Sequence, residues 1–187
     1  MLKALRSRPT DVWGLEEVLA ACNWDDQAHA AGAGLALAES GLVEIESTKT
    51  TIWSPGPEGV AALENGLLEQ RIWDWLGSQT DDSRGMKDLQ SSGVTSKQET
   101  GIGIGLLKGL GCALENGTFV LPETTDATIV TLVARKSFLE QCANGADEAD
   151  LDTDLLAHFR KRKGLIESTE GTTRTWSLTD AGRKLSE

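Results

Sequence analysis

The sequence has few of the residues from which metal and catalytic centres are built. Among 187 residues there are three cysteines and two histidines. Cys22, Cys112 and Cys142 lie far apart with no Cys-x-x-Cys pair, and neither histidine has a second ligand at metal spacing. No Ser/His/Asp or Cys/His set indicates a nucleophilic enzyme. We therefore expect reduced thiols, and no metal ion, cofactor or catalytic site in this chain.

Long apolar runs and an excess of positive charge are also missing. The longest uncharged stretches, such as residues 27–38, are shorter than the ~18–20 apolar residues that span a bilayer. The first residues lack the apolar segment of a secretory signal. There are 18 Lys and Arg against 29 Asp and Glu, a formal net charge of −11. We expect a cytoplasmic protein without a membrane partner, and we exclude a generally basic protein that coats nucleic acid.

A glycine-rich segment, Gly-Ile-Gly-Ile-Gly at residues 101–105, does not meet the requirements of a nucleotide-binding loop. A dinucleotide fingerprint needs a preceding apolar strand and a third glycine where this chain has Leu106. We interpret the segment as part of a helix whose glycines let a neighbouring element approach closely. Each such glycine costs roughly 1 kcal/mol relative to alanine, which the packing must offset.

An internal repeat organises the chain. Residues 41–64 and 164–187 share eight identities in 24 positions without a gap, and the identities include Trp53 and Trp176. Each copy predicts a helix that ends at glycine, a short apolar strand, a polar tip, a second strand that carries the tryptophan, and a new helix. A helix followed by such a β-hairpin is typical of a winged helix.

A weaker third copy lies between these two. Asn116-Gly117 separates two strand-like runs, residues 112–115 and 118–121, and this dipeptide is the strongest short signal for a hairpin. Upstream, Ser96 and Glu99 have the spacing of a capping box and predict the start of a helix. Two other Asn-Gly pairs, at residues 65–66 and 144–145, lack strand-like flanks and indicate helix ends or loops.

These segments predict an α+β fold, mostly helical, with three tandem winged-helix domains (helix-turn-helix plus β-hairpin wing). The first module covers residues 1–66, the second 67–125 and the third 126–187. The third is abridged, because only the acidic residues 146–150 remain for a middle helix. The predicted helices are Trp13–Cys22, Asp25–Ser40, Leu67–Leu76, Arg84–Ser91, a helix from Ser96, Ala127–Cys142 and Leu151–Lys163.

Positive charge is concentrated in the third module. Residues 1–66 carry 4 cations and 10 anions, residues 67–126 carry 5 and 9, and residues 127–187 carry 9 and 10. The helix at residues 25–39 has no Lys or Arg and opens with two aspartates, so it would repel a DNA backbone. The candidate phosphate-binding residues are Arg160, Lys161, Arg162, Lys163, Arg174 and Lys97. The alternative is a solvated helix end whose cations complement the helix dipole.

Four stretches together resemble the N-terminal region of the archaeal and eukaryotic cytosolic phenylalanyl-tRNA synthetase α subunit. They are residues 47–59, 65–71, 103–111 and 155–166, and their order and spacing cover nearly the whole chain. The most specific part is the Arg-Lys-Arg-Lys-Gly-Leu run that starts at Arg160.

The resemblance implies three winged-helix-type domains that hold the tRNA body while a class II catalytic core charges it with phenylalanine. It implies tRNA-Phe, the rest of the α subunit and the β subunit of an α2β2 enzyme as partners, with ATP and Mg²⁺ at the catalytic core. The chain itself would then have no ligase activity. A tandem winged-helix transcription regulator and a winged-helix scaffold that binds only proteins remain the alternatives.

Overall fold

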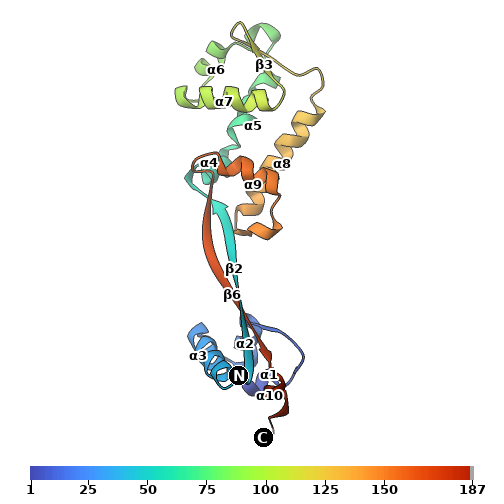
Figure 1. Cartoon of the computed structure of the whole chain (residues 1–187). Coiled ribbons are helices and arrows are strands. Elements are labelled where there is room, and N and C mark those ends of the chain that lie inside the picture. Colours follow the sequence, from blue (N-terminus) through green and yellow to red (C-terminus); the bar gives the residue numbers. More distant parts are fainter. Residues whose placement is uncertain (186–187) are drawn as a thin grey trace. The chain divides into compact units, whose positions relative to one another are not determined.

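A computed structural model describes residues 1–185 (Figure 1). The fold is α+β and mostly helical, as predicted. The chain forms two compact units. We call residues Met1–Thr51 with the segment from Glu170 onward the terminal unit, and residues Ile52–Thr169 the central unit. The three-module boundaries at residues 66 and 125 stay a prediction, and Glu187, which closes the sequence repeat, lies outside the described residues.

The terminal unit has one hydrophobic cluster, built around Trp13, Val18 and Trp176. Helix α3 begins after Asp26, whose side chain accepts a hydrogen bond from the amide of Ala28. The helix predicted from Trp13 begins later, at Leu15, because Trp13 and Gly14 pair with β6 instead. The helices and the short strand of this unit are α1 (Leu2–Leu5), β1 (Trp13–Gly14), α2 (Leu15–Cys22), α3 (Gln27–Glu39) and α10 (Asp180–Lys184).

The two hairpins predicted within residues 43–54 and 166–177 are wrong. Each segment is one continuous strand, β2 (Val43–Pro55) and β6 (Ile166–Leu178) (Figure 1). Both belong to a four-stranded sheet of order β1-β6-β2-β5. Neither strand contains an Asn-Gly or Asp-Gly pair for a tight turn. Their threonines favour extended backbone. The strands of the two copies therefore pair with each other.

This pairing places each repeated tryptophan in the core of the other repeat. Trp53 lies opposite Ala146 and packs in a cluster with Phe138 and Phe159. Trp176 lies opposite Trp13 and packs in the cluster of the terminal unit. The second half of each predicted wing therefore packs in the same hydrophobic cluster as the first residues of the other copy.

The repeated glycines have the same reciprocal relation. A Cβ atom at Gly59 would overlap the carbonyl of Leu165, and one at Gly182 would overlap the carbonyl of Leu42. Leu42 and Leu165 are equivalent positions near the start of each copy, and Gly59 and Gly182 are equivalent positions near its end. The identity of these positions in the sequence repeat therefore reflects close backbone contacts between the two copies.

The central unit holds two hydrophobic clusters, one around Phe138 and Phe159 and one around Ile72 and Leu107. It contains the ends of β2 and β6 that lie within residues 52–169. Its remaining elements are α4 (Pro57–Asn65), α5 (Leu68–Ser78), the 3-10 helix η1 (Asp81–Ser83), α6 (Met86–Ser92), α7 (Lys97–Gly109), β3 (Ala113–Glu115), β4 (Thr118–Val120), α8 (Asp126–Cys142), β5 (Ala146–Asp147), the 3-10 helix η2 (Glu148–Asp150) and α9 (Thr153–Arg160).

Local signals in the central unit are confirmed. Strands β3 and β4 pair around Asn116 and Gly117, whose φ angles are 49° and 81°, as a tight hairpin turn requires. Ser96 and Glu99 form the predicted capping box of α7. Of the glycines at 101, 103 and 105, only Gly103 faces a neighbour, the side chain of Ile72 on α5.

Candidate nucleic-acid interface

The predicted basic run lies at the end of α9 in the central unit. The helix begins after Asp152, whose carboxylate accepts hydrogen bonds from the amides of Asp154 and Leu155 at 3.0 and 2.9 Å. It ends at Arg160, and the chain turns through Gly164, which has a φ of 78°, into β6. We call residues 160–163 the basic turn. Its cations follow the C-terminus of a helix, where the helix dipole favours positive charge.

The four cations of the basic turn do not share one direction. Arg160, Lys161 and Lys163 are exposed, whereas the side chain of Arg162 is 15% exposed. No ion pair involves the three exposed cations among the residues that the structure describes. These three are therefore free to contact phosphate, while Arg162 faces the protein interior.

Arg162 binds a buried carboxylate. Its Nη1 lies 2.7 Å from Oε1 of Glu69 on α5, and the same oxygen lies 3.3 Å from Nη1 of Arg135 on α8. The side chain of Glu69 is 0% exposed, and its second oxygen has no hydrogen-bond partner within residues 1–185. We call Glu69, Arg135 and Arg162 the buried triad. Burial lowers the pKa of Arg135, and the charge of Glu69 partly opposes this effect.

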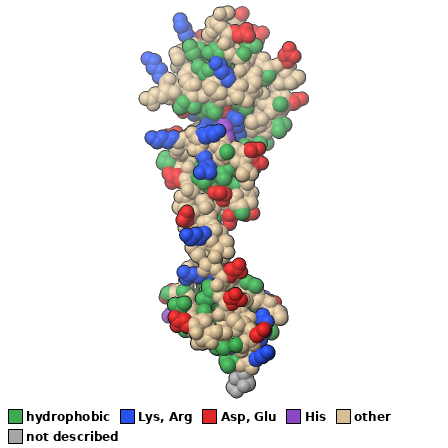
Figure 2. Space-filling view, viewed as in Figure 1, with side chains coloured by type: hydrophobic (Ala, Val, Ile, Leu, Met, Phe, Trp, Pro, Cys, Tyr) green, Lys and Arg blue, Asp and Glu red, His purple; other side chains and the backbone are tan. Residues whose placement is uncertain are grey.

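His158 on α9 lies beside the buried triad. Burial lowers its pKa to about 4, and the charges of Arg135, Arg162 and Lys161 act in the same direction against the opposing charge of Glu69. Figure 2 shows several Lys and Arg side chains on one face of the central unit. The imidazole is therefore neutral at physiological pH and adds no positive charge to the interface.

Trp53 supports the basic turn from β2. The guanidinium carbon of Arg160 lies 5.5 Å from the centroid of its ring, a cation–π contact. The indole Nε1 of Trp53 donates a hydrogen bond to Glu148 at 2.8 Å. A residue predicted only as part of a wing thus positions a candidate phosphate-binding side chain.

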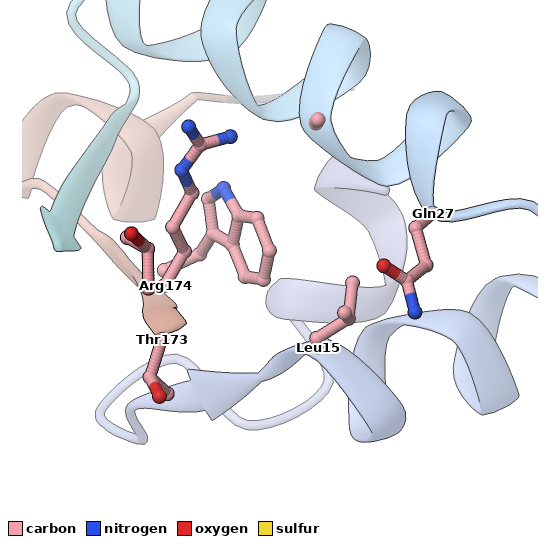
Figure 3. Close-up of a pocket in the computed structure, with 7 residues that line it drawn as sticks. Leu15, Gln27, Thr173 and Arg174 are labelled. Atoms are coloured by element: carbon pink, nitrogen blue, oxygen red, sulfur yellow. The ribbon is translucent and has the colours of Figure 1, made fainter. Parts of the chain in front are cut away.

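The other two candidates lie away from the basic turn in the chain. Lys97 is exposed and is the first residue of α7. Arg174 is exposed on β6, in the terminal unit. It lines a cavity of about 350 Å³ in which it lies on one side and Leu15 and Gln27 on the other (Figure 3). The roles of Lys97, Arg162 and Arg174 in RNA binding stay predictions.

Sequence reasoning missed Glu69, although a signal for it was present. Ile72 and Leu76 follow Glu69 by three and seven residues on α5, and both are buried. This spacing places the glutamate on the apolar face of the helix. A buried carboxylate needs positive partners, and the position of Glu69 could therefore have predicted that some arginines are not available to a ligand.

The part of the chain that the structure describes contains neither a metal-binding cluster nor a membrane-spanning helix. Within residues 1–185, no three His, Cys, Asp or Glu side chains gather in a way that could hold a metal ion. In the same part of the chain, no helix combines the length and the apolar character needed to cross a membrane.

Comparison with known proteins points to one kind of enzyme subunit. No protein-family model matches the chain. The chain is similar to the phenylalanine–tRNA ligase alpha subunit of Methanococcus maripaludis, with 25% identity over 183 residues, 97% of this chain and 35% of the relative. It is also similar to the alpha subunit of Methanospirillum hungatei, with 26% identity over 150 residues, 80% of this chain and 27% of the relative. The chain thus spans about a third of the length of these relatives.

Proposed function

We propose that this chain binds transfer RNA as a region of a phenylalanine–tRNA ligase α subunit, and that Arg160, Lys161 and Lys163 contact the RNA backbone. One observation carries the proposal. The three exposed cations share one turn in a chain that is similar to such a subunit over 97% of its length. The helical clusters would be modules of winged-helix type, and the protein would act in the cytoplasm.

The chemistry of the basic turn suits phosphate better than bases. Lys and Arg side chains on a turn can each pair with one phosphate, and such contacts position RNA without reading its sequence. The chain as a whole has a formal net charge of −11. The surface outside the basic turn therefore repels RNA at long range. Binding therefore depends on a small local set of cations and should be strongly salt-dependent.

The activity of the whole enzyme would lie outside this chain. Charging of tRNA-Phe with phenylalanine, the use of ATP and Mg²⁺, and assembly with a β subunit as α2β2 are proposals for the longer protein. We assign none of the residues described here to those steps. The role proposed for this chain is to hold the tRNA body.

Filter binding with tRNA-Phe and with random duplex DNA, over a series of salt concentrations, tests the proposal. Three phosphate contacts predict a slope of log K against log salt concentration of roughly −2 to −3. Changing Arg160, Lys161 and Lys163 together to Gln should weaken tRNA binding by roughly 10- to 100-fold at low salt and flatten this slope. The matched control changes three exposed cations of the terminal unit, Lys3, Lys49 and Lys184, to Gln.

The control removes the same charge and should change tRNA affinity by less than about threefold. An equal loss in both variants would mean that net charge, not the basic turn, determines binding. Tighter binding of duplex DNA than of tRNA would favour a transcription regulator. No affinity for either nucleic acid at low salt would favour a scaffold that binds only proteins.

A further inference from the structure

The buried triad joins three separate helical segments of the central unit through one oxygen atom. Glu69 belongs to α5, Arg135 to α8, and Arg162 follows α9 within the basic turn. Both guanidinium groups approach Oε1 of Glu69, at 3.3 and 2.7 Å. Glu69 therefore links the basic turn to α5 and, through the shared oxygen, to Arg135 of α8.

Burial makes it unfavourable to break the ion pairs of the buried triad. The side chains of Glu69, Arg135 and Arg162 are 0%, 11% and 15% exposed. A buried carboxylate without its cations, or buried guanidinium groups without their carboxylate, would be strongly unfavourable. The side chain of Arg162 is consequently held inward, and the backbone of the basic turn is held with it.

We infer that Glu69 is the positioning residue of the RNA interface. By holding Arg162 inward, it orients Arg160, Lys161 and Lys163 outward at a fixed spacing, although it is an anion and does not itself touch RNA. This inference rests on the proposed function, because it assigns a role to Glu69 in the same interface.

Charge alone predicts that loss of Glu69 would strengthen RNA binding. Removing an anion near a cluster of cations raises the local positive potential and should strengthen RNA binding. The change would also release Arg162 as a fourth cation. The positioning role instead predicts weaker binding after loss of Glu69, because the turn loses the contact that orders its exposed side chains.

The test measures tRNA-Phe affinity and its salt slope for Glu69→Gln, Arg162→Gln and the double variant. Each single change should weaken binding by roughly three- to tenfold, and the double variant should bind like the weaker single variant, because residues that act as one unit are not additive. Glu167→Gln is the matched control. Glu167 is exposed and close to the basic turn in sequence, and its loss should leave affinity unchanged or slightly increased.

The possible outcomes separate the two proposals. Unchanged or tighter binding by Glu69→Gln overturns the positioning role, and so does an additive loss in the double variant, which would make Arg162 an independent RNA contact. Both results leave the proposed function intact if the triple variant of the basic turn still loses binding. Absence of tRNA binding by the unmodified chain overturns both proposals.

Circular dichroism and thermal unfolding check that each variant is folded. If Glu69→Gln does not fold, Glu69→Asp tests the positioning role instead, because Asp keeps the negative charge but its side chain is one methylene shorter. The positioning role predicts weaker tRNA binding by Glu69→Asp in spite of the unchanged charge. Wild-type affinity in that variant would overturn it.

Discussion

The terminal and central units use positive charge in different ways. In the terminal unit, Arg8 pairs with Asp11 and Glu17 at 3.1 and 2.9 Å, and Arg183 pairs with Asp180 at 3.0 Å. In the central unit, Arg162 of the basic turn pairs with a buried anion, Glu69, at 2.7 Å. Exposed pairs contribute little to stability, but they occupy cations. What distinguishes the basic turn is that three exposed cations without an ion pair among the described residues lie within four consecutive positions. This local density, and not the charge count of a module, favours phosphate binding there.

The two units also differ in how their strands meet. The hairpin β3–β4 of the central unit is local, with its turn at Asn116 and Gly117. Strands β2 and β6 instead run through both units and pair across the repeat. The β3–β4 hairpin depends on its turn residues. The pairing of β2 with β6 depends on the burial of Trp53 and Trp176 in separate hydrophobic clusters.

The largest expected effect comes from removing those tryptophans. Trp176→Ala and Trp53→Ala should each cost roughly 3–5 kcal/mol of unfolding free energy, because a large core side chain is lost. Trp176→Ala should accelerate amide hydrogen exchange in α2 and α3, and Trp53→Ala should do so in α8 and α9. Faster hydrogen exchange in α2 and α3 after Trp53→Ala would mean that each repeat folds as a local hairpin. That result would contradict the pairing of β2 with β6.

A smaller effect separates two glycines of α3. A Cβ atom at Gly34 would overlap the indole of Trp176, whereas one at Gly32 would meet no atom within 4 Å. Gly34→Ala should destabilise the terminal unit by roughly 1–3 kcal/mol through overpacking. Gly32→Ala should stabilise it by roughly 0.5–1 kcal/mol through helix propensity. Urea unfolding of both variants measures the difference, and equal effects would contradict the packing of Trp176 on α3.

A third effect, of at most similar size, is a pH dependence that arises from His158 in the central unit. The pKa of His158 is about 4 in the folded chain, below its usual 6.5, so the unfolded chain binds the proton more readily. The contribution of the neutral imidazole is complete above pH 6.5 and is lost as pH falls toward 4, by roughly 1–3 kcal/mol. Burial is the main cause of this low pKa; Arg135, Arg162 and Lys161 add to the shift, and Glu69 opposes it.

Urea unfolding at pH 7.5 and at pH 5 measures this contribution, with His158→Gln as the reference. The wild type should lose more stability than His158→Gln between the two values, because the variant has no imidazole to protonate. Equal losses would mean that His158 titrates alike in the folded and unfolded chain. Comparison with the variant is necessary because carboxylates also begin to titrate in this range.

The candidate site was predictable only in part. The density of cations at residues 160–163 is a property of the sequence, and the structure leaves three of the four exposed. The inward direction of Arg162 depends on Glu69, which lies 93 residues earlier. The residues around a cation in a charged run do not indicate whether a distant buried carboxylate will bind it.

The sequence by itself determined the local elements. The capping box at Ser96, the hairpin turn at Asn116 and the end of α4 at Gly66 follow from short-range hydrogen bonds and backbone angles, which neighbouring residues set. Only the tertiary structure decided which strand β2 and β6 would pair with and which arginine would face inward. Both outcomes depend on burial among residues far apart in the chain, where the gain from excluding water and pairing charge exceeds any local preference.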